Sequence, residues 1–423
     1  MKLLFVHQNF PGQFKSLAPA FAAMSDVTVA ALSMQAGKSF PGLQAFSHVA
    51  TQGTTPNISP LLLDTEAKLI RASSAVKTAL AMRDQGFTPD VIVAHPGWGE
   101  TLFLGEVWPA ARQLHFLEFF YHSQGVDTDF DPEFASTDFD NRLRVASKQP
   151  APLWALHQMD WGLSPTRWQK ETYPRWEWDR VSVIHDGVDT QAIAPRGGLS
   201  MTLKEAGVTL RSGDPIVTFV NRNLEPYRGY HIFMRALPEI LAQHPTAQIM
   251  IVGGEGVSYG APPPKGGPSW KQRFFDEVSD RIDKRRVHFL GNIPYPSFIG
   301  LLQLSAAHVY LTYPFVLSWS LLEAMACECL IIGSRTAPVM EVIDDGKEGV
   351  LVDFFDPAAL AAAVLDGLKR PEAYRGMRQA ARRRVIENYD LASVCLPAKW
   401  RWCARLRRAR AGRRCRIPVT PRL

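Results

Sequence analysis

Short runs of branched and aromatic residues recur along the chain and alternate with stretches of helical spacing. The runs lie at 3–6, 27–32, 91–94, 116–121, 181–184, 216–220, 248–252, 287–290, 308–312, 330–332 and 350–352. Between them, sets such as Phe14, Leu17, Ala18 and Phe21 have the period of an amphipathic helix. Apolar strands that alternate with helices predict parallel sheets covered by helices on both faces.

This alternation breaks between Gln191 and Pro215, where proline and glycine residues crowd together. The 423 residues are enough for two domains. We therefore predict an α/β protein with two doubly wound, Rossmann-like domains that face each other across a cleft. The predicted ranges are an N-terminal acceptor domain at 1–190, a linker at 191–214, a donor domain at 215–372, a helix at 373–396 returning toward the N-terminal domain, and a basic tail at 397–423.

The net charge of +6 comes from the C-terminal end of the chain. Ten of the 47 basic residues and no acidic residue follow position 398, so the rest has 37 basic and 41 acidic residues. A fold that binds nucleic acid is not indicated. The Trp400-Arg401-Trp402 stretch and the arginines could dock on an anionic membrane, could be a functionless end, or could reflect a shifted reading frame.

The five cysteines are an odd number in a long chain, which favours a reducing compartment over a disulfide framework. The first apolar run is too short for the core of a signal peptide, and no apolar run is long enough to cross a membrane. We expect a cytoplasmic protein, with peripheral contact at the inner face of the membrane as the alternative.

The loop predicted after 216–220 contains Arg222, Arg228 and Gly229 ahead of a helix. Arginine binds phosphate in bidentate fashion, and a helix N-terminus adds partial positive charge. The loop is therefore a candidate site for a diphosphate, although it would also serve as an ordinary solvated loop.

Two further motifs of the second domain have a functional and a structural interpretation. Gly253 and Gly254 follow a predicted strand, where glycine lets a backbone approach a ligand closely or simply makes a turn. Glu323 is expected in the first turn of a helix. There it would accept hydrogen bonds from a sugar diol, or complete a capping box with Ser320.

In the first domain, candidate residues follow the predicted strands. Gly12 would let backbone amides reach a ligand, while His95 and His122 would face the cleft. Three Asp-x-Asp motifs lie at 127–129, 129–131 and 138–140, and such a motif can hold a divalent metal. We interpret them as a solvated acidic loop and predict no metal site.

Taken together, these motifs resemble the GT-B glycosyltransferases of the large retaining family 4, over about residues 1–395. The carrying residues are Asn221-Arg222, Tyr227-Arg228-Gly229, Ile251-Val252-Gly253-Gly254, Phe289-Leu290-Gly291-Asn292-Ile293-Pro294, Leu322-Glu323-Ala324-Met325-Ala326, Ala337-Pro338-Val339-Met340-Glu341-Val342-Ile343, Pro11-Gly12 and Val183-Ile184-His185-Asp186-Gly187-Val188-Asp189. The resemblance implies that Arg222 and Arg228 bind the pyrophosphate and that His122 contacts the sugar. It further implies donor binding by Gly12, Gly253, Gly254, Asn292, Ile293, Leu322 and Glu323, with Glu323 on the ribose hydroxyls.

The sequence departs from the family pattern at Phe315, where the first of two paired glutamates is expected. The contacts to the donor sugar must therefore differ. We expect transfer of a hexose-type sugar, with retention and without a metal, from a UDP- or GDP-type nucleotide diphosphate-sugar. The acceptor would be a saccharide or a lipid-linked molecule in polysaccharide or glycoconjugate synthesis, and no other cofactor is expected. The alternatives are a sugar-nucleotide epimerase and a binding protein that has lost catalysis.

Overall fold

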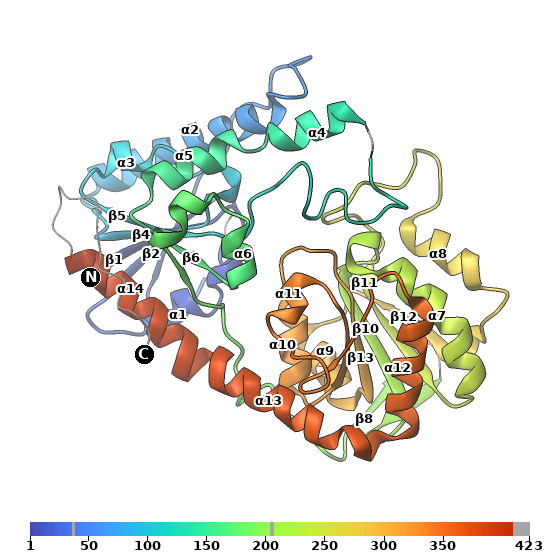
Figure 1. The fold of residues 1–423 in the computed structure, drawn as a ribbon. Coiled ribbons are helices and arrows are strands. Elements are labelled where there is room, and N and C mark those ends of the chain that lie inside the picture. The colour runs from blue at the N-terminus through green and yellow to red at the C-terminus, as the bar shows by residue number, and fades with distance from the viewer. Residues whose placement is uncertain (36–38, 137, 204–206, 409–423) are drawn as a thin grey trace. The chain divides into compact units, whose positions relative to one another are not determined.

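The computed structural model describes residues 1–35, 39–136, 138–203 and 207–408, and its internal contacts divide the chain into two units (Figure 1). Unit 1 comprises Met1–Asp129, Ala135–Gly187 and the chain from Ala392 onward. Unit 2 comprises Val188–Leu391 together with Phe130–Phe134, a short segment whose neighbours on both sides belong to unit 1.

Within the described residues, unit 1 has a parallel sheet of seven strands in the order β3-β2-β1-β4-β5-β6-β7. The strands are β1 (Lys2–Val6), β2 (Thr28–Ser33), β3 (Leu43–Ser47), β4 (Val91–Ala94), β5 (Arg112–Phe116), β6 (Trp161–Ser164) and β7 (Val181–Val183). The strand order reverses between β1 and β4. Loops at such a switch point diverge and leave a crevice at the carboxyl ends of the strands.

Helices cover both faces of this sheet (Figure 1). They are α1 (Leu17–Ala22), α2 (Leu63–Asp84), α3 (Leu104–Val107), α4 (Phe139–Ala146), α5 (Pro150–Gln158), α6 (Arg167–Glu171) and α14 (Leu396–Arg408). Successive residues of a strand point to opposite faces. Accordingly, Leu3 and Phe5 of β1 pack with α1 and α14, while Leu4 and Val6 belong to the cluster that contains Ala75 and Ala79 of α2.

The C-terminal helix α14 is part of the core of unit 1. Trp402 stacks on Trp161 with ring centroids 4.3 Å apart, and Trp400 meets Phe21 edge-on at 5.0 Å. The two tryptophans, for which membrane docking is one of three interpretations of the sequence, therefore pack inward. The exposed side chains of this helix are arginines, and residues 409–423 of the predicted tail lie outside the described part of the chain.

A buried ion pair also holds α14 in place, because Lys399 Nζ lies 3.0 Å from Asp186 Oδ1 and both side chains are less than one-tenth exposed. We expect Lys399→Met to destabilise the protein by about 3–5 kcal/mol, since it leaves a buried carboxylate without its cation. The exposed pair between Arg407 and Asp90, at 3.8 Å, provides a matched control. Arg407→Met should cost at most about 1 kcal/mol. Equal losses in urea unfolding would contradict this account.

Unit 2 contains a parallel sheet of six strands among its described residues, in the order β12-β11-β10-β13-β14-β15. They are β10 (Ile216–Asn223), β11 (Gln248–Gly254), β12 (Val287–Gly291), β13 (Ala307–Tyr310), β14 (Leu330–Ser334) and β15 (Val350–Val352). A separate antiparallel pair is formed by β8 (Ser200–Leu203) and β9 (Val208–Arg211). The order again reverses in the middle, here between β10 and β13.

The sheet of unit 2 is likewise covered on both faces (Figure 1). Its helices are α7 (Tyr230–Gln243), α8 (Trp270–Val278), α9 (Tyr295–Leu304), α10 (Trp319–Ala326), α11 (Ala337–Met340), α12 (Pro357–Lys369) and α13 (Arg375–Tyr389). One core cluster contains residues of α7, α8 and α12, and a second contains residues of α9, α10 and α13. These two doubly wound α/β units confirm the predicted fold class.

The structure corrects several predicted strands. The run 116–121 is not a strand, because β5 ends at Phe116 and most of that run forms the following loop. The prediction also missed β3, β6 and the β8–β9 pair. In the described part of the chain, no helix is long and apolar enough to cross a membrane.

Candidate functional site

Loops from two neighbouring strands meet at the switch point of unit 2. The loop after β10 contains the short 3₁₀ turn Pro226–Arg228, and the loop after β13 begins at Leu311. Arg228 joins the two loops, because its guanidinium donates to Thr312 Oγ1 at 2.7 Å and to the carbonyl of Val316 at 2.9 Å. A cation is thereby fixed at the place where open α/β sheets bind ligands.

Aromatic rings surround this cation. The guanidinium carbon of Arg228 lies 4.9 Å from the ring centroid of Tyr259 and 5.5 Å from that of Phe315. Arg228 is only 4% exposed, and the face of an aromatic ring attracts a cation electrostatically. Phe315, which stands where a glutamate was expected, is itself buried and meets Tyr227 edge-on at 5.2 Å. Phe315 therefore places an apolar ring beside Arg228, at the position where the family pattern has a carboxylate.

The other predicted arginine, Arg222, lies near the end of β10 and is exposed. The loop predicted after 216–220 therefore starts later than expected, because β10 continues to Asn223. Gly229 then caps α7 with φ +68°, and a Cβ at this position would lie 2.3 Å from Leu311 Cβ. Only glycine fits this turn without displacing Leu311, so Gly229 sets the start of α7 beside Arg228.

A buried carboxylate that is not among the predicted site residues shapes the loop after β11. Glu225 is fully buried and accepts hydrogen bonds from the backbone N–H groups of Ser258, Tyr259 and Gly260, at 3.1, 3.3 and 3.1 Å. These bonds hold Tyr259 over Arg228. A glutamate between a strand and a proline turn is a weak signal in a sequence, since such residues are commonly solvated.

The predicted glycines at the end of β11 pack closely against neighbouring residues. A Cβ on Gly253 would lie 2.8 Å from Leu224 Cδ2, and a Cβ on Gly254 would lie 2.7 Å from Asn223 Oδ1. The same Gly254 position is 3.2 Å from Asn292 Nδ2, so the structure brings Asn292 beside this glycine turn. Ile293 is half-buried against the neighbouring apolar clusters.

Glu323 lies in α10 and is 6% exposed. Its Oε1 accepts a hydrogen bond from the hydroxyl of Tyr295 at 2.5 Å. The predicted capping box is wrong, because α10 begins at Trp319 and Ser318 caps it by accepting from the Ser320 N–H. Glu323 is the fifth residue of the helix, beyond its first turn. The side chain of Leu322 is fully buried in the core.

In unit 1, the predicted sugar-contacting residue His122 donates from Nε2 to the carbonyl of Thr172 at 2.6 Å. Gly12 begins a 3₁₀ turn with φ +46°, and a Cβ there would lie 2.2 Å from His7 Nε2. The glycine therefore makes room for the His7 ring, a role that its place in the sequence did not suggest.

The acidic segment 127–131 is not simply solvated, which corrects that prediction. Asp127 and Asp131 are 1% and 3% exposed, whereas Asp129 is exposed. In unit 2, Asp131 Oδ2 accepts from the hydroxyl of Tyr313 at 2.6 Å and lies 3.0 Å from His231 Nε2. Among the residues that the structure describes, no three metal-binding side chains come together.

Asp131 provides a pH-dependent test of this segment. Burial by itself would raise the pKa of the Asp131 carboxyl, but hydrogen bonding to His231 and Tyr313 lowers it overall. Its contribution to stability is present above the ordinary pKa of 3.8 and is lost as the pH falls through the lowered value. We expect Asp131→Asn to cost about 3–5 kcal/mol at pH 7, as for other broken buried pairs. Urea unfolding should show this cost shrinking below pH 4, while the exposed Asp140→Asn changes little at either pH.

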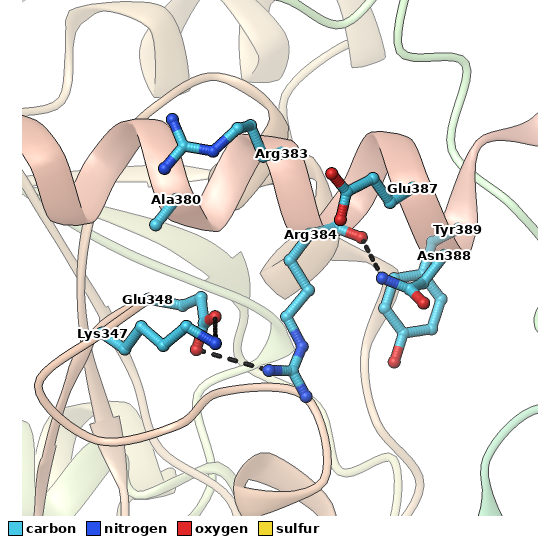
Figure 2. Close-up of a pocket in the computed structure, with 8 residues that line it drawn as sticks. All are labelled: Lys347, Glu348, Ala380, Arg383, Arg384, Glu387, Asn388 and Tyr389. Carbon is cyan, nitrogen blue, oxygen red and sulfur yellow. Dashed lines mark hydrogen bonds and ion pairs between the residues drawn. The ribbon is translucent and has the colours of Figure 1, made fainter.

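A cavity of about 300 Å³ lies elsewhere in unit 2, between α13 and the loop before β15. Figure 2 shows Arg384 reaching from α13 toward Glu348. Glu348 forms ion pairs with Arg384 at 3.4 Å and with Lys347 at 3.3 Å. None of the predicted site residues lines this cavity, so it is distinct from the switch point.

Two family models match the chain. The model for "Glycosyl transferase family 4 group" matches residues 25–193, and the model for "Glycosyl transferases group 1" matches residues 202–384. The alpha-maltose-1-phosphate synthase of Mycolicibacterium smegmatis is 30% identical over 288 residues, which are 60% of this chain and 70% of that protein.

Other relatives match over a shorter stretch. The D-inositol 3-phosphate glycosyltransferase of Acidothermus cellulolyticus is 28% identical over 205 residues, which are 47% of this chain. The glycogen synthase of Mycobacterium tuberculosis is 28% identical over 184 residues, or 44% of this chain. The chain spans less than half the length of these two relatives, 43% and 41% respectively.

Solved structures share the fold. The sucrose-phosphate synthase of Thermosynechococcus elongatus superposes with a TM-score of 0.70 at 16% identity, over 95% of this chain and 98% of its own. Anabaena HepE in complex with UDP-glucose gives a TM-score of 0.63 at 14% identity, over 96% of this chain and all of its own. At these identities the likeness establishes the fold.

Proposed function

Since this chain belongs to the GT-B glycosyltransferases of family 4, group 1, we propose that it moves a hexose-type sugar from a nucleotide diphosphate-sugar to an acceptor hydroxyl. The observation that carries the proposal is Arg228, a buried cation at the switch point of unit 2. The donor is of the UDP or GDP type. Anabaena HepE, which shares the fold, binds UDP-glucose, and this favours a UDP-sugar over a GDP-sugar as the donor.

The chemistry needs positive charge where the diphosphate leaves. The bond between the anomeric carbon and the diphosphate oxygen breaks, the acceptor oxygen bonds to that carbon, and the acceptor proton departs with the diphosphate. Arg228 is positioned before the reaction starts, and such preorganised charge stabilises a developing anion without reorganisation. Arg222 and the N-terminus of α7 supply further positive charge, so we propose a reaction that needs no metal.

The remaining donor contacts are proposed for Glu323, Asn292, Ile293 and the glycines at the end of β11. Glu323 is an acceptor suited to a diol such as that of ribose. Leu322, whose side chain is in the core, can contribute only its backbone. In unit 1 we propose that His122 contacts the sugar. The configuration at the anomeric carbon would be retained, and the product would belong to polysaccharide or glycoconjugate synthesis.

This function is tested by incubating the full chain with UDP-glucose, GDP-mannose or ADP-glucose, a mixed saccharide and lipid acceptor extract, and EDTA. Release of the nucleoside diphosphate that depends on the extract is expected, with a product whose anomeric proton coupling matches that of the donor. Isomerised donor without acceptor would instead indicate an epimerase.

Phe315 is the observation that favours a second candidate, a sugar-nucleotide-binding protein without turnover. Its buried ring supplies no polar contact to a donor sugar. This alternative predicts binding of the nucleotide-sugar in the same incubation, with no release of diphosphate under any acceptor condition.

Peripheral membrane contact is proposed for the exposed arginines of α14, namely Arg401, Arg405, Arg407 and Arg408. Basic residues near an anionic surface contribute about 1 kcal/mol each. Phosphatidylglycerol vesicles should co-sediment with the wild-type protein and less with a variant in which these four residues are glutamine. Equal sedimentation would exclude the contact.

A further inference from the structure

Loops after three neighbouring strands of unit 1 bring polar side chains together at its switch point. His7 follows β1, His95 follows β4 and Glu118 lies two residues after the end of β5. These strands are adjacent in the sheet, and the order reverses between β1 and β4. This is the position in unit 1 that corresponds to the position of Arg228 in unit 2.

A directed chain of hydrogen bonds begins at the loop after β1. His7 Nδ1 accepts from the Asn9 backbone N–H at 3.0 Å, which places the proton of the neutral ring on Nε2. His7 Nε2 then donates to Gln13 Oε1 at 2.6 Å, and Gln13 Nε2 donates to Glu118 Oε1 at 2.8 Å. The orientation of the Gln13 amide is thus determined by both of its partners.

The second oxygen of Glu118 is approached from the loop after β4. His95 Nδ1 accepts from the Gly97 backbone N–H at 3.1 Å, so its Nε2 carries the proton and lies 3.4 Å from Glu118 Oε2. The His95 ring stacks on Trp98 with centroids 4.4 Å apart. Glu118 therefore has a donor on each oxygen. Gln13 is oriented by the His7 side chain, and His95 is oriented by the Gly97 backbone N–H.

Two glycines leave room for the histidine rings of this cluster. Gly12 adopts φ +46°, and any side chain there would strike the His7 ring. A Cβ on Gly97 would lie 2.8 Å from His95 Cε1. Both glycines that follow the histidines in sequence are therefore needed to seat the rings that support Glu118.

The cluster carries a negative charge on Glu118. Burial by itself would raise the pKa of Glu118, but His95 and Gln13 lower it overall through hydrogen bonds. Burial lowers the pKa of His7 to about 4, with a smaller contribution from repulsion by His95 when that ring is protonated, so His7 is neutral at pH 7. Since the Glu118 side chain is still 31% exposed, its carboxylate has free acceptor capacity toward solvent.

We propose that Glu118 is a binding site for the hydroxyl groups of a neutral sugar or polyol. A carboxylate accepts hydrogen bonds from hydroxyls and repels phosphate, which Arg228 binds instead. The inference rests on the proposed function, and the hydroxyls belong either to the acceptor or to the hexose of the donor. Phe119 stacks on Trp168 with centroids 5.9 Å apart, which places aromatic surface next to Glu118 in the chain.

The test uses methyl α-D-glucopyranoside, glucose 6-phosphate, UDP and UDP-glucose as probes of the full-length protein. Binding of the two monosaccharides is followed by saturation-transfer NMR, and binding of the two nucleotides by calorimetry. The variants are Glu118→Gln, Glu118→Asp in case the first fails to fold, and the exposed Glu106→Gln as the matched control. Hydrogen bonds to a charged group contribute about 1.5–3 kcal/mol, so Glu118→Gln should weaken sugar binding about 10- to 100-fold.

The two sources of hydroxyls give different results. If Glu118 binds the acceptor, Glu118→Gln loses methyl glucoside and keeps UDP-glucose. If it binds the donor hexose, the variant weakens UDP-glucose and leaves UDP unchanged. Unchanged binding of methyl glucoside and of UDP-glucose in Glu118→Gln, or tighter binding of glucose 6-phosphate than of methyl glucoside, would overturn the proposal. A failure of the proposed function is recognised separately, because the wild-type protein would then bind none of the nucleotides, or would bind a nucleotide-sugar and release no diphosphate in the incubation with acceptors.

Discussion

An Arg228→Met variant is expected to lower kcat/KM for sugar transfer by a factor of about 10²–10³, the usual effect of removing one preorganised donor from a developing anion. Methionine keeps an apolar side chain against the rings of Tyr259 and Phe315, so the space beside them stays filled. The leaving diphosphate then loses its buried counter-charge. Steady-state kinetics and the midpoint of thermal unfolding should be measured on the same preparation.

Two further variants separate charge from packing. Arg228→Lys retains the positive charge and loses the planar donor geometry, so an intermediate loss is expected. Thr312→Val removes the hydroxyl that accepts from Arg228 at 2.7 Å and leaves the cation in place. A single hydrogen bond contributes about 1 kcal/mol, so this variant should lose up to about tenfold. A stable Arg228→Met enzyme with wild-type turnover would contradict the assignment.

A Glu323→Gln variant is expected to raise KM for the nucleotide-sugar by about 10- to 100-fold, because hydrogen bonds to a charged group contribute about 1.5–3 kcal/mol. Ribose lies away from the bond that breaks, so kcat should change little. A change in KM alone is the kinetic sign of lost uniform binding. Initial rates over a range of donor concentrations give both constants.

Tyr295→Phe is the matched control for this variant. It removes the hydroxyl that donates to Glu323 at 2.5 Å and preserves the carboxylate for a ligand. Because Tyr295 is 49% exposed, the loss of its hydroxyl should cost little stability. KM for the donor should stay within about threefold of the wild-type value, since the charged acceptor is intact. Equal effects of the two substitutions would show that Glu323 serves only to hold Tyr295.

The alternation of strands and helices was enough to predict both doubly wound sheets, because strands buried on two faces are continuous apolar runs. The same pattern does not reveal strands that are short or polar. β5 has the sequence Arg-Gln-Leu-His-Phe, and the more apolar residues that follow it favour a strand at 116–121 instead. That shift placed Glu118 inside a predicted strand and hid it as a candidate residue.

Side-chain roles were less predictable than elements, because they depend on contacts between distant parts of the chain. The motif around Arg228 was visible from arginine and glycine near a strand end, but its aromatic surroundings come from Tyr259 and Phe315 on other loops. The sequence predicts a solvated Asp131, since its partners His231 and Tyr313 lie 100 or more positions away in the sequence. For the same reason the sequence alone places Trp400 and Trp402 in a tail, although their partners Phe21 and Trp161 lie far away in the sequence.

The most direct test of the central claim is thermal unfolding of the wild-type and Arg228→Met proteins with UDP-, GDP- and ADP-sugars, with and without EDTA. A ligand that binds only the native state raises apparent stability by about 2.7 kcal/mol at 100 times its Kd. We predict stabilisation of the wild-type protein by one nucleotide family, undiminished by EDTA and lost in Arg228→Met. Absence of any shift, or a shift that EDTA abolishes, would contradict a metal-free diphosphate site at Arg228.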